Sequence, residues 1–279
     1  MKLSQENYDK IMMDPRYLDI GGLPSNFKGY EFKNILIRPF GINELKLISR
    51  AASLKEPQHV IRAIDLTISQ DVNELTVGDY YYMLMWHKLH SYTKTPLIVE
   101  WPCPMEVWHR KRDGLVQLVP PTAEQEAEAA KSEAIEDKFV LEDCNTVNSE
   151  PISMVNVEIV SLEDDFVLPE GLDFPRVGTM LEVDELMQDP DMQFLVPALQ
   201  WMPGNSMVEK MKQFEDAPDL DLFQRANKAN QEIVHGVKQT TTLTCRRCHS
   251  RYPYTIKLDP LSFFFFFARL DCLRCILRC

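Results

Sequence analysis

Residues 76–103 read TVGDYYYMLMWHKLHSYTKTPLIVEWPC, and this stretch decides the fold because it carries a helix start, a helix, a turn, a strand and a cysteine in succession. Thr76 precedes Asp79 by three residues, which is the spacing of a capping box. A helix is therefore predicted to begin directly after Thr76. The helix must end before Pro96, because the residue before a proline disfavours helical dihedral angles. Residues 97–101 then alternate like a strand.

The predicted helix is apolar on nearly every face, since apolar and aromatic residues fill the positions between those that recur at three and four. Such a helix has to be covered on more than one side. Aromatic side chains supply much of the energy of protein–protein interfaces, so we expect some of them to contact partners, with core packing as the alternative. The expected contact residues are Tyr80, Tyr82, Trp86 and Trp101.

The composition is that of an ordinary chain of one large or two small domains, with 279 residues, 45% hydrophobic and 26% charged. The net charge of -12 argues against nucleic acid as a main partner, because phosphate binding needs clustered Lys and Arg. The amino end lacks the pattern of a signal peptide, and no run reaches the length of a membrane helix, so no membrane contact is expected. The odd count of 7 cysteines predicts a reducing compartment, with thiols as core residues or metal ligands.

The order of helical and strand patterns predicts the α+β class, with a helical amino-terminal unit, a strand-rich central region and a carboxyl-terminal hairpin. Helical spacing recurs at 43–54, 57–69, 181–212 and 219–234, and strand patterns occur at 30–38 and on both sides of Cys245. A further hairpin is predicted to turn at Asp113 and Gly114. Gly236 is predicted as a helix stop.

Changes in composition divide the chain into five expected segments. They are an irregular arm at 1–29, a helical unit with flanking strands at 30–103, a strand-rich region at 104–180, helices with a Cys-x-x-Cys hairpin at 181–262, and an atypical tail at 263–279. Within the third segment, residues 120–137 are rich in Ala and Glu and nearly free of large apolar residues. We expect them to form either a solvated helix or a linker.

Cys245 and Cys248 have the spacing with which two thiolates grip one tetrahedral zinc ion from a tight turn between strands. A structural zinc is therefore expected, and two completions of the site are open. One uses Cys272 and Cys275 in the tail, which gives two Cys-x-x-Cys pairs at ribbon spacing. The other uses Cys103 and Cys144 from the middle of the chain, and it would tie the hairpin to the central region.

The tail itself is unusual, since five phenylalanines at 263–267 precede the aperiodic sequence ARLDCLRCILRC. A phenylalanine run implies a pyrimidine-rich stretch of the gene, where a slipped base would put all later residues out of frame. This hypothesis favours the completion through Cys103 and Cys144. Resequencing across the run tests it, and an unbroken frame would remove the reason for setting the tail aside.

No catalytic motif is present that would name an active residue, because the chain has no Gly-x-Gly-x-x-Gly, no phosphate loop and no His-Glu-x-x-His. Ten glycines are also few for a nucleotide-binding fold. The chain is therefore expected to be non-enzymatic, with no catalytic residue.

A family resemblance is carried by ILIRPFGINELKLISRA, DYYYMLMWHKLHSYTKTPLIVEWPC, EDCNTVN and the Cys-x-x-Cys of Cys245 and Cys248, and it is clearest over residues 30–148. These pieces resemble the baseplate hub proteins and hub-assembly factors of T-even-type contractile-tailed phages. The resemblance implies a non-enzymatic late protein that contacts other hub or spike proteins. Such a protein acts in the host cytoplasm during assembly, and it either remains in the virion tail baseplate or leaves after assembly.

The competing hypothesis is a zinc-ribbon regulatory or nucleic-acid-binding protein. Its basis is a basic cluster around the Cys-x-x-Cys turn, formed by Arg246, Arg247, His249 and Arg251. Within so acidic a chain these residues are too few for strong phosphate affinity, so this hypothesis ranks second.

Overall fold

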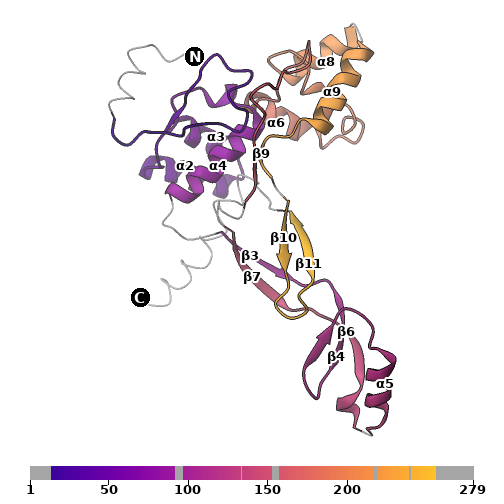
Figure 1. Ribbon diagram of the computed structural model, residues 1–279. Helices are drawn as coiled ribbons and strands as arrows, with labels where there is room; N and C mark the ends of the chain where they lie inside the picture. The colour runs from indigo at the N-terminus through magenta and orange to yellow at the C-terminus, as the bar shows by residue number, and fades with distance from the viewer. Residues whose placement is uncertain are drawn as a thin grey trace. The chain divides into compact units, whose positions relative to one another are not determined.

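The structure, a computed structural model, describes residues 14–91, 97–132, 134–152, 157–216, 219–238 and 240–255, with the backbone alone for 97–99 and 150–152. Both helices and short strands are present, so the predicted α+β class is confirmed (Figure 1). The chain divides into two compact units. The first contains the described residues up to 91 and from 158 to 238, and the second those from 97 to 157 and from 240 to 255.

The first unit is mainly helical. Its elements are β1 (Leu18–Asp19), β2 (Leu36–Ile37), α2 (Ile42–Leu54), α3 (Gln58–Asp65), η1 (Val72–Glu74), α4 (Val77–Ser91), β8 (Ile159–Val160), α6 (Val177–Leu186), α7 (Val196–Leu199), α8 (Met207–Asp216), α9 (Leu220–Glu232) and β9 (Gly236–Val237). Helices α2, α3, α4 and α9 confirm the helices predicted near the same residues.

The predicted strand at 30–38 is wrong for most of its length, because only Leu36–Ile37 forms a strand, β2, which pairs with β1. Tyr30 and Phe32 instead stack on each other, with ring centroids 4.5 Å apart. The Tyr30 hydroxyl donates to the carboxylate of Asp79 at 2.5 Å, and this bond holds the segment against α4 rather than in a sheet.

The start of α4 shows why the Asp79 carboxylate is available to the N-terminal segment. The Asp79 N–H donates to Thr76 Oγ1 at 3.2 Å, as a capping box predicts. In a complete capping box the Asp79 carboxylate would accept from the Thr76 N–H. Here the Thr76 N–H donates to the Tyr30 hydroxyl at 2.7 Å instead, and the Asp79 carboxylate accepts from the Ser25 N–H at 2.9 Å. Burial and the Asp79 carboxylate raise the pKa of Tyr30, so its hydroxyl stays a donor.

Two glycines allow α4 and β9 to cross with backbone against backbone. A Cβ atom on Gly78 would lie 2.5 Å from the His235 carbonyl oxygen, and one on Gly236 would lie 2.6 Å from the Gly78 carbonyl oxygen. The prediction that Gly236 stops the preceding helix is wrong, since α9 ends at Glu232. Gly236 is required instead because its φ of 102° and its close neighbour both exclude a side chain.

Helices α6 to α9 build a hydrophobic core in the first unit. The helical region predicted at 181–212 is broken into α6, α7 and α8, with Pro197 in the first turn of α7, where its missing N–H costs little. The buried side chains of this core include Phe174, Leu199, Trp201 and Met207. Trp201 is oriented by an indole N–H bond to Asn230 Oδ1 of α9 at 3.2 Å.

The second unit is built from short antiparallel strands. Its elements are β3 (Leu97–Pro102), β4 (Glu106–Arg110), β5 (Leu115–Gln117), α5 (Ala123–Ala130), η2 (Ile135–Asp137), β6 (Phe139–Asp143), β7 (Val147–Ile152), β10 (Thr240–Thr244) and β11 (Arg251–Thr255). Strand β3 pairs with β7, β4 pairs with both β5 and β6, and β10 pairs with β11 (Figure 1).

Local sequence explains the connections in this unit. The predicted turn at Asp113 and Gly114 joins β4 to β5, and Asp113 accepts from the Arg110 guanidinium at 2.6 Å. The acidic stretch forms α5, whose Thr122 and Gln125 make a complete capping box. Only Ala129 of α5 is buried, so the helix contributes little apolar surface.

The predicted division at residue 103 is wrong, because β3 pairs with β7 and therefore belongs with the strands that follow it. The segment predicted at 181–262 is also divided, since its helices lie in the first unit and its hairpin in the second. The arm predicted at 1–29 contains β1, and the tail at 263–279 lies outside the described residues. Within the described chain, every helix is too short or too polar to span a bilayer.

We predict that Gly78→Ala separates α4 from β9 and lowers the free energy of unfolding by about 2 kcal/mol or more, because the added methyl meets a backbone carbonyl. Gly178→Ala is the matched control, since it is also the second residue of a helix and its Cβ would have ordinary contacts at 3.4 Å. That variant should be neutral or stabilised by up to about 1 kcal/mol. Urea unfolding measures both, and equal effects would contradict the crossing.

We predict that Lys210→Met removes a rise in stability at alkaline pH. Burial lowers the pKa of Lys210 from its ordinary value of 10.5 to about 8. The unfolded chain therefore binds more protons between these two pH values, and stability should rise across that window. Unfolding free energies at several pH values should show a smaller rise in the variant, whereas the exposed neighbour Lys212→Met should retain it. Parallel curves for all three proteins would refute the prediction.

Candidate metal centre

The candidate site consists of four cysteines. Two of them, Cys103 and Cys144, lie in a two-stranded ribbon, in which the pair β3–β7 is followed by the pair β4–β6, at the point where the pairing is interrupted. Pro102 pairs with Val147 on one side of the break and Glu106 pairs with Asp143 on the other, so three residues of each strand fall between the ladders. Cys103 and Cys144 are the first residues of these two breaks. The Cys103 N–H donates to the Thr146 carbonyl at 3.0 Å and the Cys144 N–H donates to the Met105 carbonyl at 2.8 Å. Backbone bonds on both strands therefore fix the two thiols.

The other two cysteines lie in the turn of the β10–β11 hairpin, as the sequence predicts. The Cys245 N–H donates to the Ser250 carbonyl and the His249 N–H donates to the Cys245 carbonyl, both at 3.0 Å. His249 has a φ of 56°, which reverses the chain within the turn. This tight turn brings Cys245 and Cys248 to the same side.

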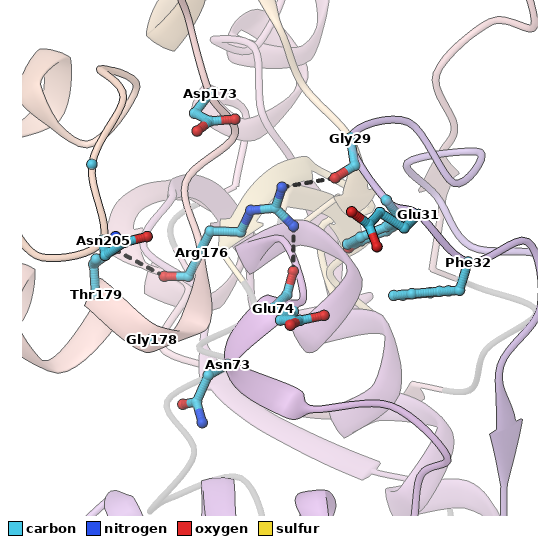
Figure 2. Close-up of a pocket in the computed structure, with 12 residues that line it drawn as sticks. Gly29, Glu31, Phe32, Asn73, Glu74, Asp173, Arg176, Gly178, Thr179 and Asn205 are labelled. Atoms are coloured by element: carbon cyan, nitrogen blue, oxygen red, sulfur yellow. Dashed lines mark hydrogen bonds between the residues drawn. The ribbon is translucent and has the colours of Figure 1, made fainter. Parts of the chain in front are cut away.

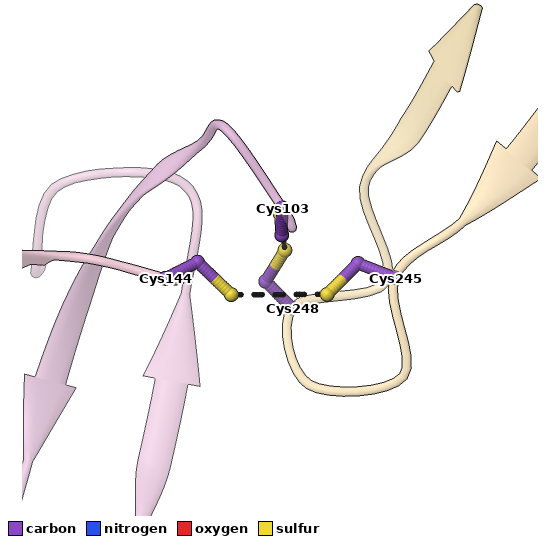
Figure 3. A group of neighbouring side chains, drawn as sticks. All are labelled: Cys103, Cys144, Cys245 and Cys248. Carbon is purple, nitrogen blue, oxygen red and sulfur yellow. Dashed lines mark hydrogen bonds between the residues drawn. The ribbon is translucent and has the colours of Figure 1, made fainter. Parts of the chain in front are cut away.

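The four thiols form one buried cluster (Figure 3). The Sγ atoms of Cys103 and Cys248 are 3.7 Å apart, as are those of Cys144 and Cys245, and all four Sγ atoms lie within 4.8 Å of one another. A disulfide needs a sulfur–sulfur distance of about 2.05 Å, so the cysteines are free. A tetrahedron of thiolates about 2.3 Å from one zinc ion has edges of about 3.8 Å. The cluster is therefore compatible with a metal site.

The protein surroundings affect the thiols unequally. Burial opposes ionisation of Cys245, but the backbone amides of Cys248 and Arg247 and the side chain of Asn148 outweigh it and lower its pKa to about 6. Burial raises the pKa of Cys103 to about 12. The turn thus supplies a thiolate, whereas the Cys103 thiol needs a bound cation to ionise near neutral pH.

An outer layer of polar side chains joins the hairpin turn to the ribbon. Arg247 donates to the Cys144 carbonyl at 3.0 Å and to the Glu142 carboxylate at 2.6 Å. The same carboxylate pairs with His109 at 3.2 Å. Asn148 contacts both sides of the junction. Such residues hold metal ligands in place in known metal proteins.

The structure brings together Cys103, Cys144, Cys245 and Cys248, which is one of the two completions expected from the sequence. The other completion used Cys272 and Cys275, which lie outside the described residues. Sequence reasoning missed Asn148 and Ser250, which complete the surroundings of the thiols. The signal available for Asn148 was its position four residues after Cys144, in the EDCNTVN segment.

Three of the four residues expected to contact partners are buried, and the fourth is half-buried. Tyr80, Trp86 and Trp101 are 0%, 7% and 4% exposed, so the expectation that they contact partners is wrong and the alternative of core packing holds. Trp101 stacks on Tyr252 of the hairpin with centroids 5.7 Å apart. Tyr82 is half-buried, and its role in contacts stays a prediction.

The first unit contains a cavity of about 440 Å³ (Figure 2). Arg176 lies in its wall, donating to the Gly29 carbonyl at 2.8 Å and to the Glu74 carbonyl, and its guanidinium lies 5.3 Å from the Tyr30 ring. The guanidinium joins two loops in this way.

Comparison of the chain with family models, with curated proteins and with solved structures finds no match.

Proposed function

We propose that Cys103, Cys144, Cys245 and Cys248 hold one structural zinc ion that stabilises the second unit. The observation that carries this proposal is the set of four buried sulfurs that lie within 4.8 Å of one another. Four thiolates close the coordination sphere and leave no position for a substrate, which distinguishes structural from catalytic zinc. A four-iron cluster would need the sulfurs to stand farther apart around its larger core.

The size of the core supports a metal as well. The buried apolar side chains described in the second unit are few, and four of them are the cysteines themselves: Trp101, Cys103, Val107, Ala129, Cys144, Val157, Leu243, Cys245 and Cys248. A small unit with so little apolar burial needs an additional constraint to fold. A zinc ion would supply it by joining the ribbon to the hairpin.

We predict about one zinc per chain in the purified native protein, with Cys103→Ser and Cys144→Ser each losing most of it. Chelation should lower the stability of the second unit by several kcal/mol, on the order of 4 kcal/mol when free zinc is about 1,000 times the dissociation constant. Metal analysis and unfolding with and without chelator measure these effects.

The matched controls are Cys272→Ser and Cys275→Ser, which change the alternative ligands in the tail. Both should keep the zinc. Retention of zinc in Cys103→Ser together with its loss in Cys272→Ser would overturn the proposed ligand set, and absence of metal from the wild type would overturn the zinc itself.

We further propose that the protein is a non-enzymatic component or assembly factor of a contractile-tail baseplate hub, acting through contacts with hub or spike proteins in the host cytoplasm during assembly. The support is the resemblance over residues 30–148, which includes the EDCNTVN segment and β3 that meet at the cysteines. Large apolar side chains exposed in the second unit, such as Val140 and Leu141, offer contact surface.

The basic turn supports the competing nucleic-acid role only weakly. Arg247 is engaged by Glu142 and the Cys144 carbonyl, and Arg246 donates to the Ser149 carbonyl at 2.6 Å. Both guanidinium groups therefore already have protein partners. His249 and Arg251 are the exposed basic residues that remain.

We predict that the protein binds hub or spike proteins of the same phage at physiological salt, and that Tyr82→Ala weakens this binding roughly tenfold. DNA and RNA should give no shift beyond weak binding that disappears as salt is raised. Pull-down and gel-shift assays test both arms. Salt-resistant binding to nucleic acid without binding to hub proteins would favour the zinc-ribbon alternative.

A further inference from the structure

The side chain of Asn148 lies at the centre of the junction between the ribbon and the hairpin turn. It belongs to β7, opposite Trp101 of β3, and is 0% exposed. Its Oδ1 accepts from the Arg246 N–H at 2.9 Å, and its Nδ2 donates to the Thr146 carbonyl at 2.9 Å. Because a backbone N–H can only donate, the first bond fixes which end of the amide carries the oxygen.

This orientation leaves the second hydrogen of the Asn148 amide with one acceptor. Nδ2 lies 3.6 Å from Cys245 Sγ, within the range of a hydrogen bond to sulfur. Both amide hydrogens of Asn148 are thus used, one on the ribbon and one on the hairpin sulfur.

We infer that Asn148 is a positioning residue that holds the Cys245 sulfur as a ligand and sets its electron density. The inference rests on the proposed metal site. A hydrogen-bond donor to a metal-bound sulfur does not itself bind the metal. It holds the sulfur in one orientation and withdraws electron density from it, so the sulfur donates less electron density to the metal. The three amide contacts of Asn148 also join β7, the Thr146 loop and the hairpin turn, which are the segments that must meet before the metal can bind.

The test replaces zinc by cobalt, whose spectrum reports the sulfur ligands directly. Asn148→Asp keeps the acceptor for the Arg246 N–H and removes both donors, and Asn148→Leu removes all three bonds. Loss of the N–H···S bond raises the energy of the sulfur lone pairs, so the thiolate-to-cobalt charge-transfer band should move to longer wavelength. Metal affinity, measured by competition with a chelator, should fall about 10- to 100-fold.

Two control variants separate positioning from general stability. Val147→Asn changes the exposed neighbouring residue of the same strand, and it should alter neither the band nor the affinity. Trp101→Phe disturbs the buried stack on Tyr252, so it should lower stability while the band stays in place. If neither Asn148 variant folds, the smaller change Asn148→Ser is measured in the same way.

The outcomes distinguish this inference from the proposed function. Wild-type spectra and affinity in the Asn148 variants would overturn the positioning role and leave the metal site standing. A band shift in Trp101→Phe equal to that in Asn148→Asp would also overturn it, because the shift would then follow stability alone. Failure of the wild type to bind cobalt or zinc would instead overturn the metal site.

Discussion

Four sulfurs held within 4.8 Å of one another are the constraint on which the second unit depends. As thiolates they would repel, and as buried thiols they would form only weak hydrogen bonds. The proposed cation at their centre would resolve both difficulties. Because the cysteines directly follow β3 and β6 or lie in the β10–β11 turn, the same cation would join parts of the chain that lie about 100 residues or more apart.

The first unit uses different means to join distant segments. Apolar helices pack against one another, and the buried carboxylate of Asp79 holds the N-terminal segment through Ser25 and Tyr30. The crossing of Gly78 and Gly236 then brings α4 against β9 at backbone distance. These contacts need no ligand, since the Asp79 carboxylate accepts from the Ser25 N–H and from the Tyr30 hydroxyl.

Several aromatic and basic residues that stand out in the sequence make their contacts within the protein. Aromatic rings that would suit a protein–protein interface, such as those of Tyr80 and Trp86, are buried in the core. The arginines of the Cys-x-x-Cys turn bind carbonyl groups and Glu142 rather than standing free. Contact with other proteins, as proposed for a baseplate hub protein, therefore falls to residues such as Tyr82, Val140 and Leu141, which keep exposed surface.

The sequence by itself determined the α+β class, the main helices, the turn at Asp113 and the Cys-x-x-Cys hairpin, because spacing, caps and turn residues act over a few neighbours. The sequence did not decide which cysteines join Cys245 and Cys248, and the division predicted from it at residue 103 was wrong. Only the tertiary structure decided these points, since the pairing of β3 with β7 depends on contacts between distant residues. The same holds for the roles of Asn148 and Gly236, whose partners no local pattern identifies.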